Sequence, residues 1–302
     1  MKLSKNFKNL ILILPIGVSF SSSVFAEDGL IAEEMNNLTE LGFTKEEIES
    51  MPDEKLEQYK KFDSISCESD EKYYKLSYKV EPSARGIYKE GESPIVEMTM
   101  VSKEEALEAV KKAEIAEENS INPKYIIDKD KIQPNGWLRL ETFVYTGDNH
   151  EEYAIKTEFE WLKEPFCKMQ DSILTKVCED LVMVEGSEMA YIYRDYYGRE
   201  HGEYAGDHDD IMNYATDIDP SGHGCSFTFD VGKGFLGCKC EPYGKMMFMA
   251  ETKRNGVNAF TTTGLYGHAK VGGTWGINWG APTYNPSVVM DNSERTYIKW
   301  NN

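Results

Sequence analysis

The sequence predicts an α+β fold, in which a small N-terminal helical and α+β part is followed by an antiparallel β-sandwich or barrel. Apolar residues recur at helical spacing only before residue 120. From Trp137 onward they alternate with polar residues, and turn sequences separate the alternating runs. Many short strands joined by turns are typical of an antiparallel sandwich or barrel.

Residues 1–26 have the three parts of a secretory signal peptide. A basic start precedes an apolar run, and small residues end the segment at Ala26, before Glu27. The apolar run contains Pro15 and is too short to span a bilayer. We therefore expect cleavage between Ala26 and Glu27, and a secreted, extracellular protein that is not an integral membrane protein after processing.

Residues 27–120 are predicted to form the small helical and α+β region. Apolar residues at helical spacing predict two or three short helices over residues 30–62, where Thr44 and Glu47 match a capping box. Residues 70–119 predict two strands followed by a helix, which opens at a second capping box formed by Ser102 and Glu105. The short helices carry little apolar surface, so they would hardly be stable alone.

Residues 121–136 are predicted to be a linker and residues 137–302 an antiparallel β domain. The alternating runs on either side of the turn TGDNH predict a long hairpin. Further strands are predicted at 173–184, 189–197, 225–231, 245–252 and 257–263.

Charge is distributed unevenly along the chain. The net charge of −19 becomes −22 when the three lysines of the signal peptide are removed. A surface that negative repels phosphate polymers, which argues against nucleic acid as a partner. Residues 220–302 carry eight Lys/Arg and five Asp/Glu, a net charge of +3, and so residues 27–219 carry −25.

The sequence contains six cysteines, and export places them where disulfides persist. The preferred pairs are Cys167 with Cys178, and Cys225 with either Cys238 or Cys240. The last two residues share one face of a strand, so each is expected to bridge elsewhere. Two alternatives stay open: several free buried thiols, and a Cys-x-Cys redox site.

No cofactor is expected from the sequence, although one stretch is a candidate calcium loop. Asp217, Asp219 and Ser221 match the first positions of a D-x-D-x-S-G loop, where oxygen ligands converge on a hard cation. Thr228 stands where the bidentate glutamate should be. The alternative is an Asx-type turn in which Asp219 and Pro220 lead into a strand.

The stretch RDYYGREHGEYAGDHDD is a second candidate metal site, with His201, His208 and Asp210 as ligands of a divalent cation. It lacks the His-Glu-x-x-His spacing of zinc hydrolases, and a solvated acidic loop is the alternative. No nucleophile elbow is present. We assign no catalytic residue, and enzymatic activity is not the favoured interpretation.

The glycine-rich C-terminal stretch contains aromatic residues that could form a binding platform. Trp275 and Trp279 would share a face of a strand, and together with Tyr266 they would offer a surface for sugars or for a membrane interface. Packing in the core is the alternative. His268 is interpreted as structural rather than catalytic.

Several motifs carry a resemblance that spans nearly the whole mature chain. LGFTKEEIESMP, MVSKEEALEAVKKAE, NGWLRLETFVY, EFEWL, GVNAF and LYGHAKV resemble uncharacterised secreted proteins of Gram-positive bacteria, near geobacillin-like bacteriolysins. The layout is also similar to that of closticin-type bacteriocin precursors, whose active C-terminal piece is released before the proline of an Asp-Pro bond. This likeness implies a cut between Asp219 and Pro220.

Three functions follow from these observations. The first is a secreted protein that acts on other cells or at a cell surface, as a bacteriocin does. The second is a secreted metal-dependent hydrolase that uses the loop from His201 to Asp210. The third is a non-catalytic module that binds the cell envelope. In the first and third cases we expect a bacterial cell-surface target.

Overall fold

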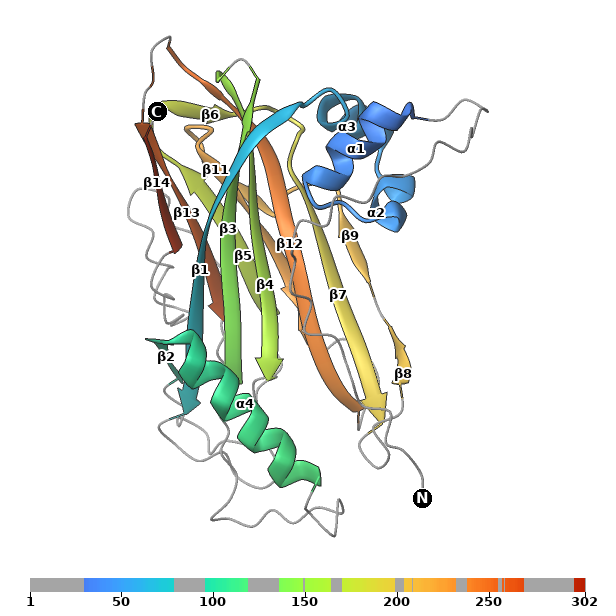
Figure 1. Ribbon diagram of the computed structural model, residues 1–302, viewed down its shortest axis with the longest axis vertical. Coiled ribbons are helices and arrows are strands. Elements are labelled where there is room, and N and C mark those ends of the chain that lie inside the picture. Colours follow the sequence, from blue (N-terminus) through green and yellow to red (C-terminus); the bar gives the residue numbers. More distant parts are fainter. Residues whose placement is uncertain are drawn as a thin grey trace.

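The fold is described from a computed structural model of the chain (Figure 1). The structure describes residues 30–78, 96–118, 136–148, 150–163, 170–198, 204–207, 209–231, 238–254, 257, 259–268 and 296–301. These residues form mostly antiparallel β-sheet with few helices, so the expectation of an antiparallel β architecture is confirmed.

In the described residues, the larger sheet has nine strands. Seven of them follow the order β2-β1-β3-β4-β12-β7-β8, while β6 pairs with β12 and β9 with β7. These neighbouring strands all pair antiparallel. The strands are β1 (Ser64–Tyr78), β2 (Val96–Val101), β3 (Gly136–Gly147), β4 (Glu152–Lys163), β6 (Leu181–Met183), β7 (Met189–Gly198), β8 (Tyr204–Asp207), β9 (Asp210–Met212) and β12 (Cys238–Thr252).

The smaller sheet has five strands within the described part of the chain, in the order β10-β11-β5-β13-β14. They are β5 (Gln170–Val177), β10 (Asp217–Ile218), β11 (Gly224–Asp230), β13 (Ala259–His268) and β14 (Thr296–Asn301).

The two sheets enclose the main hydrophobic core. Apolar side chains from both sheets form one buried cluster, which includes Phe159 and Phe248 from the larger sheet and Phe227 from the smaller one. A chain of buried hydroxyls crosses between the sheets, because Thr157 Oγ1 lies 2.6 Å from Thr175 Oγ1. The described strands thus form a sandwich of two separate sheets.

Three short helices cover one end of the outer face of the larger sheet: α1 (Ala32–Glu40), α2 (Lys45–Ser50) and α3 (Asp53–Tyr59) (Figure 1). The predicted capping box of α2 is confirmed, since Thr44 Oγ1 accepts from Glu47 N and Glu47 Oε2 accepts from Thr44 N. The helices and the sheet bury a second apolar cluster between them. Tertiary packing therefore stabilises helices that are too short to form alone.

The fourth helix, α4 (Lys103–Glu118), lies near the opposite end of the same face (Figure 1). It begins as predicted, with Glu105 N donating to Ser102 Oγ. Ala106 packs against Tyr73 of β1 and Trp137 of β3, in a third, small apolar cluster.

The region predicted as separate from the β domain contributes two strands to the larger sheet. β1 pairs with β3 from Ser64 to Leu76, and β2 continues the sheet beyond it. The boundary predicted at residues 121–136 is therefore not a boundary between sheets. The first half of β1 reads SISCESDEK and has no apolar alternation, so the sequence pattern alone does not reveal it.

Among the described residues, no helix combines the length and the apolar character that crossing a bilayer requires.

Candidate functional site

The outer face of the larger sheet is not covered by any described helix between α2 and α4 (Figure 1). Successive side chains of a strand point to opposite faces of the sheet. Leu140, Phe159 and Ile192 point into the core, so the residues next to them on their strands point to this outer side. We call the following side chains the open face: Glu71, Arg139, Glu141, Glu158, Glu160, Tyr193 and Tyr243.

Three glutamates stand side by side across the open face. Glu141 of β3 lies directly opposite Glu71 of β1 on one side and opposite Glu158 of β4 on the other. Like charges directly opposite each other destabilise a sheet. The three adjacent glutamates are therefore expected to lower the stability of the sheet.

Cations compensate the two outer glutamates better than the central one. Lys103 Nζ lies 2.8 Å from Glu71 Oε2, and Lys156 Nζ lies 2.8 Å from Glu158 Oε1. Glu141 Oε2 lies 4.0 Å from the NH1 atom of Arg139. Burial raises the pKa of Glu141, and the neighbouring carboxylates raise it further, against the opposing effects of Ser69 and Arg139.

Two stacked tyrosines adjoin the glutamates. The rings of Tyr193 and Tyr243 lie 5.1 Å apart between centroids, with an angle of 22° between their planes. Tyr243 is opposite Glu160 of β4, and 39% of its surface is exposed. The open face thus places an exposed aromatic ring beside carboxylates, which suits a ligand with cationic groups.

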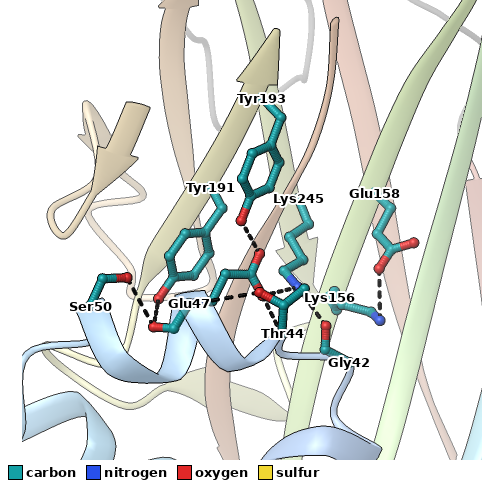
Figure 2. A network of polar contacts seen from close by, with 9 residues as sticks. All are labelled: Gly42, Thr44, Glu47, Ser50, Lys156, Glu158, Tyr191, Tyr193 and Lys245. Carbon is teal, nitrogen blue, oxygen red and sulfur yellow. Dashed lines mark hydrogen bonds and ion pairs between the residues drawn. The ribbon is translucent and has the colours of Figure 1, made fainter. Parts of the chain in front are cut away.

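A buried polar network fixes the edge of the open face next to α2 (Figure 2). Glu47, only 2% exposed, accepts from Tyr193 Oη at 2.5 Å and from Lys245 Nζ at 2.6 Å. Lys245 also donates to the backbone oxygen of Gly42, at 2.5 Å. Gly42 has a φ of +87°, which favours glycine, and a Cβ at this position would lie 2.7 Å from Lys156 Nζ. The network therefore ties α2 to β7 and β12 in one arrangement.

The charges in this network influence one another. Burial lowers the pKa of Lys245, although Glu47 opposes the shift. Burial also lowers the pKa of Lys156, but Glu158 and Tyr145 outweigh it and hold that pKa above its ordinary value. Burial, followed by Glu47, raises the pKa of Tyr193, which keeps its hydroxyl neutral and able to donate.

The predicted calcium loop is a turn in the structure. Asp219 is 4% exposed, and its Oδ1 accepts from Ser221 N at 3.1 Å and from Ser221 Oγ at 2.9 Å. Its Oδ2 lies 3.4 Å from Lys176 Nζ, while Asp217 is exposed on β10. The alternative of an Asx-type turn is confirmed. Within the described ranges, no group of three or more His, Cys, Asp or Glu side chains is arranged to hold a metal ion.

The second candidate metal site is described only in part. His201 and His208 lie outside the described residues. Asp210 of β9 is described, and its Oδ2 lies 2.8 Å from the guanidinium of Arg194, which is fully buried. Asp210 therefore serves as the counter-ion of a buried arginine, a structural role that the sequence pattern did not suggest.

The structure corrects both preferred disulfide pairs, because one member of each is a free thiol. These are Cys178 and Cys225, and Cys167 lies outside the described residues. Burial raises the pKa of Cys225 well above its ordinary value, as expected for an unreactive thiol in the core. The alternative of free buried thiols holds at Cys225.

Distance along the strands explains why Cys225 does not pair as expected. Cys225 interacts electrostatically with Glu188, which immediately precedes β7. Cys238 and Cys240 of β12 pair with the far end of β7, at Gly198 and Tyr196. Eight or more residues of strand separate the two places by roughly 25 Å. Bridged cysteines have Cα atoms within about 7 Å of each other.

The predicted aromatic platform is also corrected at its one described member. Tyr266 is fully buried, donates to Asp171 Oδ2 and accepts from Trp161 Nε1 at 2.9 Å. Tyr266 therefore belongs to the core, and Trp275 and Trp279 lie outside the described residues. Ala26 and Glu27 lie outside them too.

His268 occupies a structural position, in agreement with its interpretation from the sequence. Its Nδ1 lies 2.7 Å from Asp171 Oδ1, and both side chains are buried. Asp171 thus accepts hydrogen bonds from a tyrosine and a histidine inside the sandwich.

No protein-family model and no curated protein matches the chain. Some solved structures resemble it. The collagen-binding domain of a Staphylococcus aureus adhesin has a TM-score of 0.27 and 8% identity, over 50% of this chain and 89% of that one. The collagen-binding domain of Erysipelothrix rhusiopathiae surface protein RspB has a TM-score of 0.29 and 7% identity, over 55% of this chain and 63% of that one. The C-terminal domain of Streptococcus agalactiae BspA has a TM-score of 0.27 and 5% identity, over 76% of this chain and 84% of that one. These likenesses carry no argument about function.

Proposed function

We propose that the protein is a secreted, non-catalytic binding module that attaches to a bacterial cell surface through the open face. One observation carries the proposal: three glutamates stand directly opposite one another beside an exposed, stacked tyrosine. Natural proteins break local rules of stability mostly where function requires it. Exposed aromatic residues beside charged ones are typical of binding surfaces.

The remaining sequence features support attachment outside the cell. The first 26 residues have the pattern of a secretory signal, which supports a place outside the cell. Resemblance to secreted proteins of Gram-positive bacteria, stated above from the motifs, agrees with an extracellular role.

The observed contacts favour binding over metal-dependent hydrolysis. Asp210 is the one described member of the candidate hydrolase site, and it forms an ion pair with the buried Arg194. This internal pairing competes with any metal for the carboxylate of Asp210.

Cleavage at Asp219-Pro220 is expected to leave both pieces assembled. β12 lies between β4 and β7, and β11 and β13 lie on either side of β5, so the strands after Pro220 alternate with strands before it. Release would break the pairing of several strands at once. A variant with a site-specific protease sequence inserted after Asp219 should, once cut, give two bands on a denaturing gel but elute as one species in gel filtration. A freed C-terminal piece would support a bacteriocin-like precursor instead.

The proposed function is tested by adding labelled mature chain, residues 27–302, to intact Gram-positive cells at physiological salt. Saturable retention on the cells, without killing and without change after EDTA treatment, is expected. Killing of the cells would favour the bacteriocin-like function, and EDTA-sensitive hydrolysis of cell-wall material would favour the hydrolase. Absence of retention across a broad panel of cells would contradict attachment.

A further inference from the structure

We propose that the three helices α1–α3, which we call the helical cap, set the geometry of the aromatic edge of the open face. Glu47 of the cap is the positioning residue, and it acts through Tyr193 on the exposed ring of Tyr243. The inference rests on the proposed function and names how the same site is prepared for binding. It depends on the two stacked tyrosines of the face and on none of its carboxylates.

The helical cap is fixed to the segment that leads into β7. Lys55 Nζ donates to the backbone oxygen of Gly186 at 2.9 Å. Tyr59 Oη donates to the backbone oxygen of Ser187 at 2.8 Å, and both donor side chains are buried. Breaking such bonds leaves buried polar groups without a partner, which is costly. The cap is therefore a firm base beside the strand that carries Tyr193.

Glu47 is held at both ends of its side chain (Figure 2). Its backbone N–H donates to Thr44 Oγ1, and its Oε2 accepts from Thr44 N and from Lys245 Nζ. Its Oε1 accepts from Tyr193 Oη at 2.5 Å. The bonds to α2 and β12 fix the carboxylate, so Oε1 is an acceptor in a set position for the tyrosine hydroxyl.

Tyr193 carries this constraint from the cap to the open face. Its ring packs against the apolar cluster beneath the helices and stacks on the ring of Tyr243. Tyr193 and Tyr243 stand directly opposite each other on β7 and β12. Strand pairing sets the backbone positions of the two residues, but several rotamers of each ring remain open to it. The hydrogen bond to Glu47 selects one orientation of the Tyr193 ring, against which Tyr243 rests.

A ring that is ordered before a ligand arrives contributes more to affinity than a mobile ring. A side chain that becomes ordered only on binding loses conformational entropy at that step. Tyr243, which is 39% exposed, has already lost this freedom on folding when it stacks on a fixed Tyr193. We therefore expect weaker binding when the bond between Glu47 and Tyr193 is missing, even with the helical cap in place.

Tyr193→Phe tests the coupling, because it removes the hydroxyl and keeps the ring. The matched control is Tyr191→Phe, since the Tyr191 hydroxyl also donates to Glu47, at its backbone oxygen, and lies outside the open face. Nitration by tetranitromethane is measured by mass spectrometry at Tyr243, relative to Tyr214, which is 80% exposed. Tyr193→Phe should raise this ratio about threefold through loss of the stacking, and Tyr191→Phe less than about 1.5-fold.

Retention on intact Gram-positive cells is measured with the same two variants of the mature chain. Tyr193→Phe should weaken retention about fivefold, and Tyr191→Phe less than about twofold. Each variant loses one hydrogen bond to Glu47, so a general loss of stability would affect both alike.

The outcomes separate the positioning of Tyr243 from the proposed function. Unchanged nitration of Tyr243 in Tyr193→Phe would overturn the inference, and so would equal losses of retention in the two variants. Faster nitration with full retention would overturn it as well, because the geometry of Tyr243 would then have no effect on binding. Absence of retention for the wild type would instead contradict the proposed function, while the nitration ratio would still decide whether Glu47 positions Tyr243.

Discussion

Glu47→Ala is expected to release α1–α3 from the sheet, at a cost of about 3–5 kcal/mol. The substitution leaves the ammonium of Lys245 buried without its counter-ion, and Tyr193 loses its acceptor. Amide hydrogen exchange over residues 30–62, followed by mass spectrometry, should show protection lost there first. The sandwich core is a separate apolar cluster, so its strands should stay protected.

Two further variants test whether the loss of stability comes from the unpaired charge of Lys245. Glu46→Ala, on the same helix but exposed, should change stability by less than about 0.5 kcal/mol. Glu47→Gln with Lys245→Met removes both charges and should cost less than Glu47→Ala, because no buried charge is left unpaired. A single Glu47→Ala variant that keeps full protection over residues 30–62 would show that apolar contacts alone hold the helices.

Asp171→Ala is expected to destabilise the whole sandwich, by about 3–5 kcal/mol. Asp171 joins β5 to β13, and its loss leaves the Tyr266 hydroxyl and His268 Nδ1 without their acceptors inside the core. Urea unfolding, monitored by tryptophan fluorescence, measures the change in the free energy of unfolding.

Asp180→Ala is the matched control for the buried aspartate. Asp180 pairs with Arg254 at the surface, where 74% of the arginine side chain is exposed, and its loss should cost less than about 1 kcal/mol. Equal losses in Asp171→Ala and Asp180→Ala would contradict a structural role for the buried carboxylate.

Local signals in the sequence predicted much of the fold. The capping pairs Thr44–Glu47 and Ser102–Glu105 lie where the pattern placed them, and the hairpin around TGDNH is formed by β3 and β4. These features depend on residues close in sequence, which is why they are readable from it. The turn at Asp219 was likewise among the interpretations that the sequence supported.

The site, in contrast, depends on contacts between distant residues. Glu71, Glu141 and Glu158 become neighbours only through the register of β1, β3 and β4, and a shift of one residue in any strand would separate them. The first half of β1 is polar, so the alternation of apolar residues did not predict it as a strand. Cys225 and Tyr266 were misjudged for the same reason: their burial follows from the packing of the two sheets.

The central claim is that the open face carries the binding function, and one measurement tests it most directly. Retention on cells is compared for the wild type, for Tyr243→Ala with Glu160→Lys, and for Tyr214→Ala with Glu185→Lys. The last pair changes an equally aromatic residue, 80% exposed, and an exposed carboxylate away from the open face. With Tm unchanged in all three, the first variant should lose at least about tenfold in affinity and the second less than twofold. Full retention of the open-face variant would contradict the account.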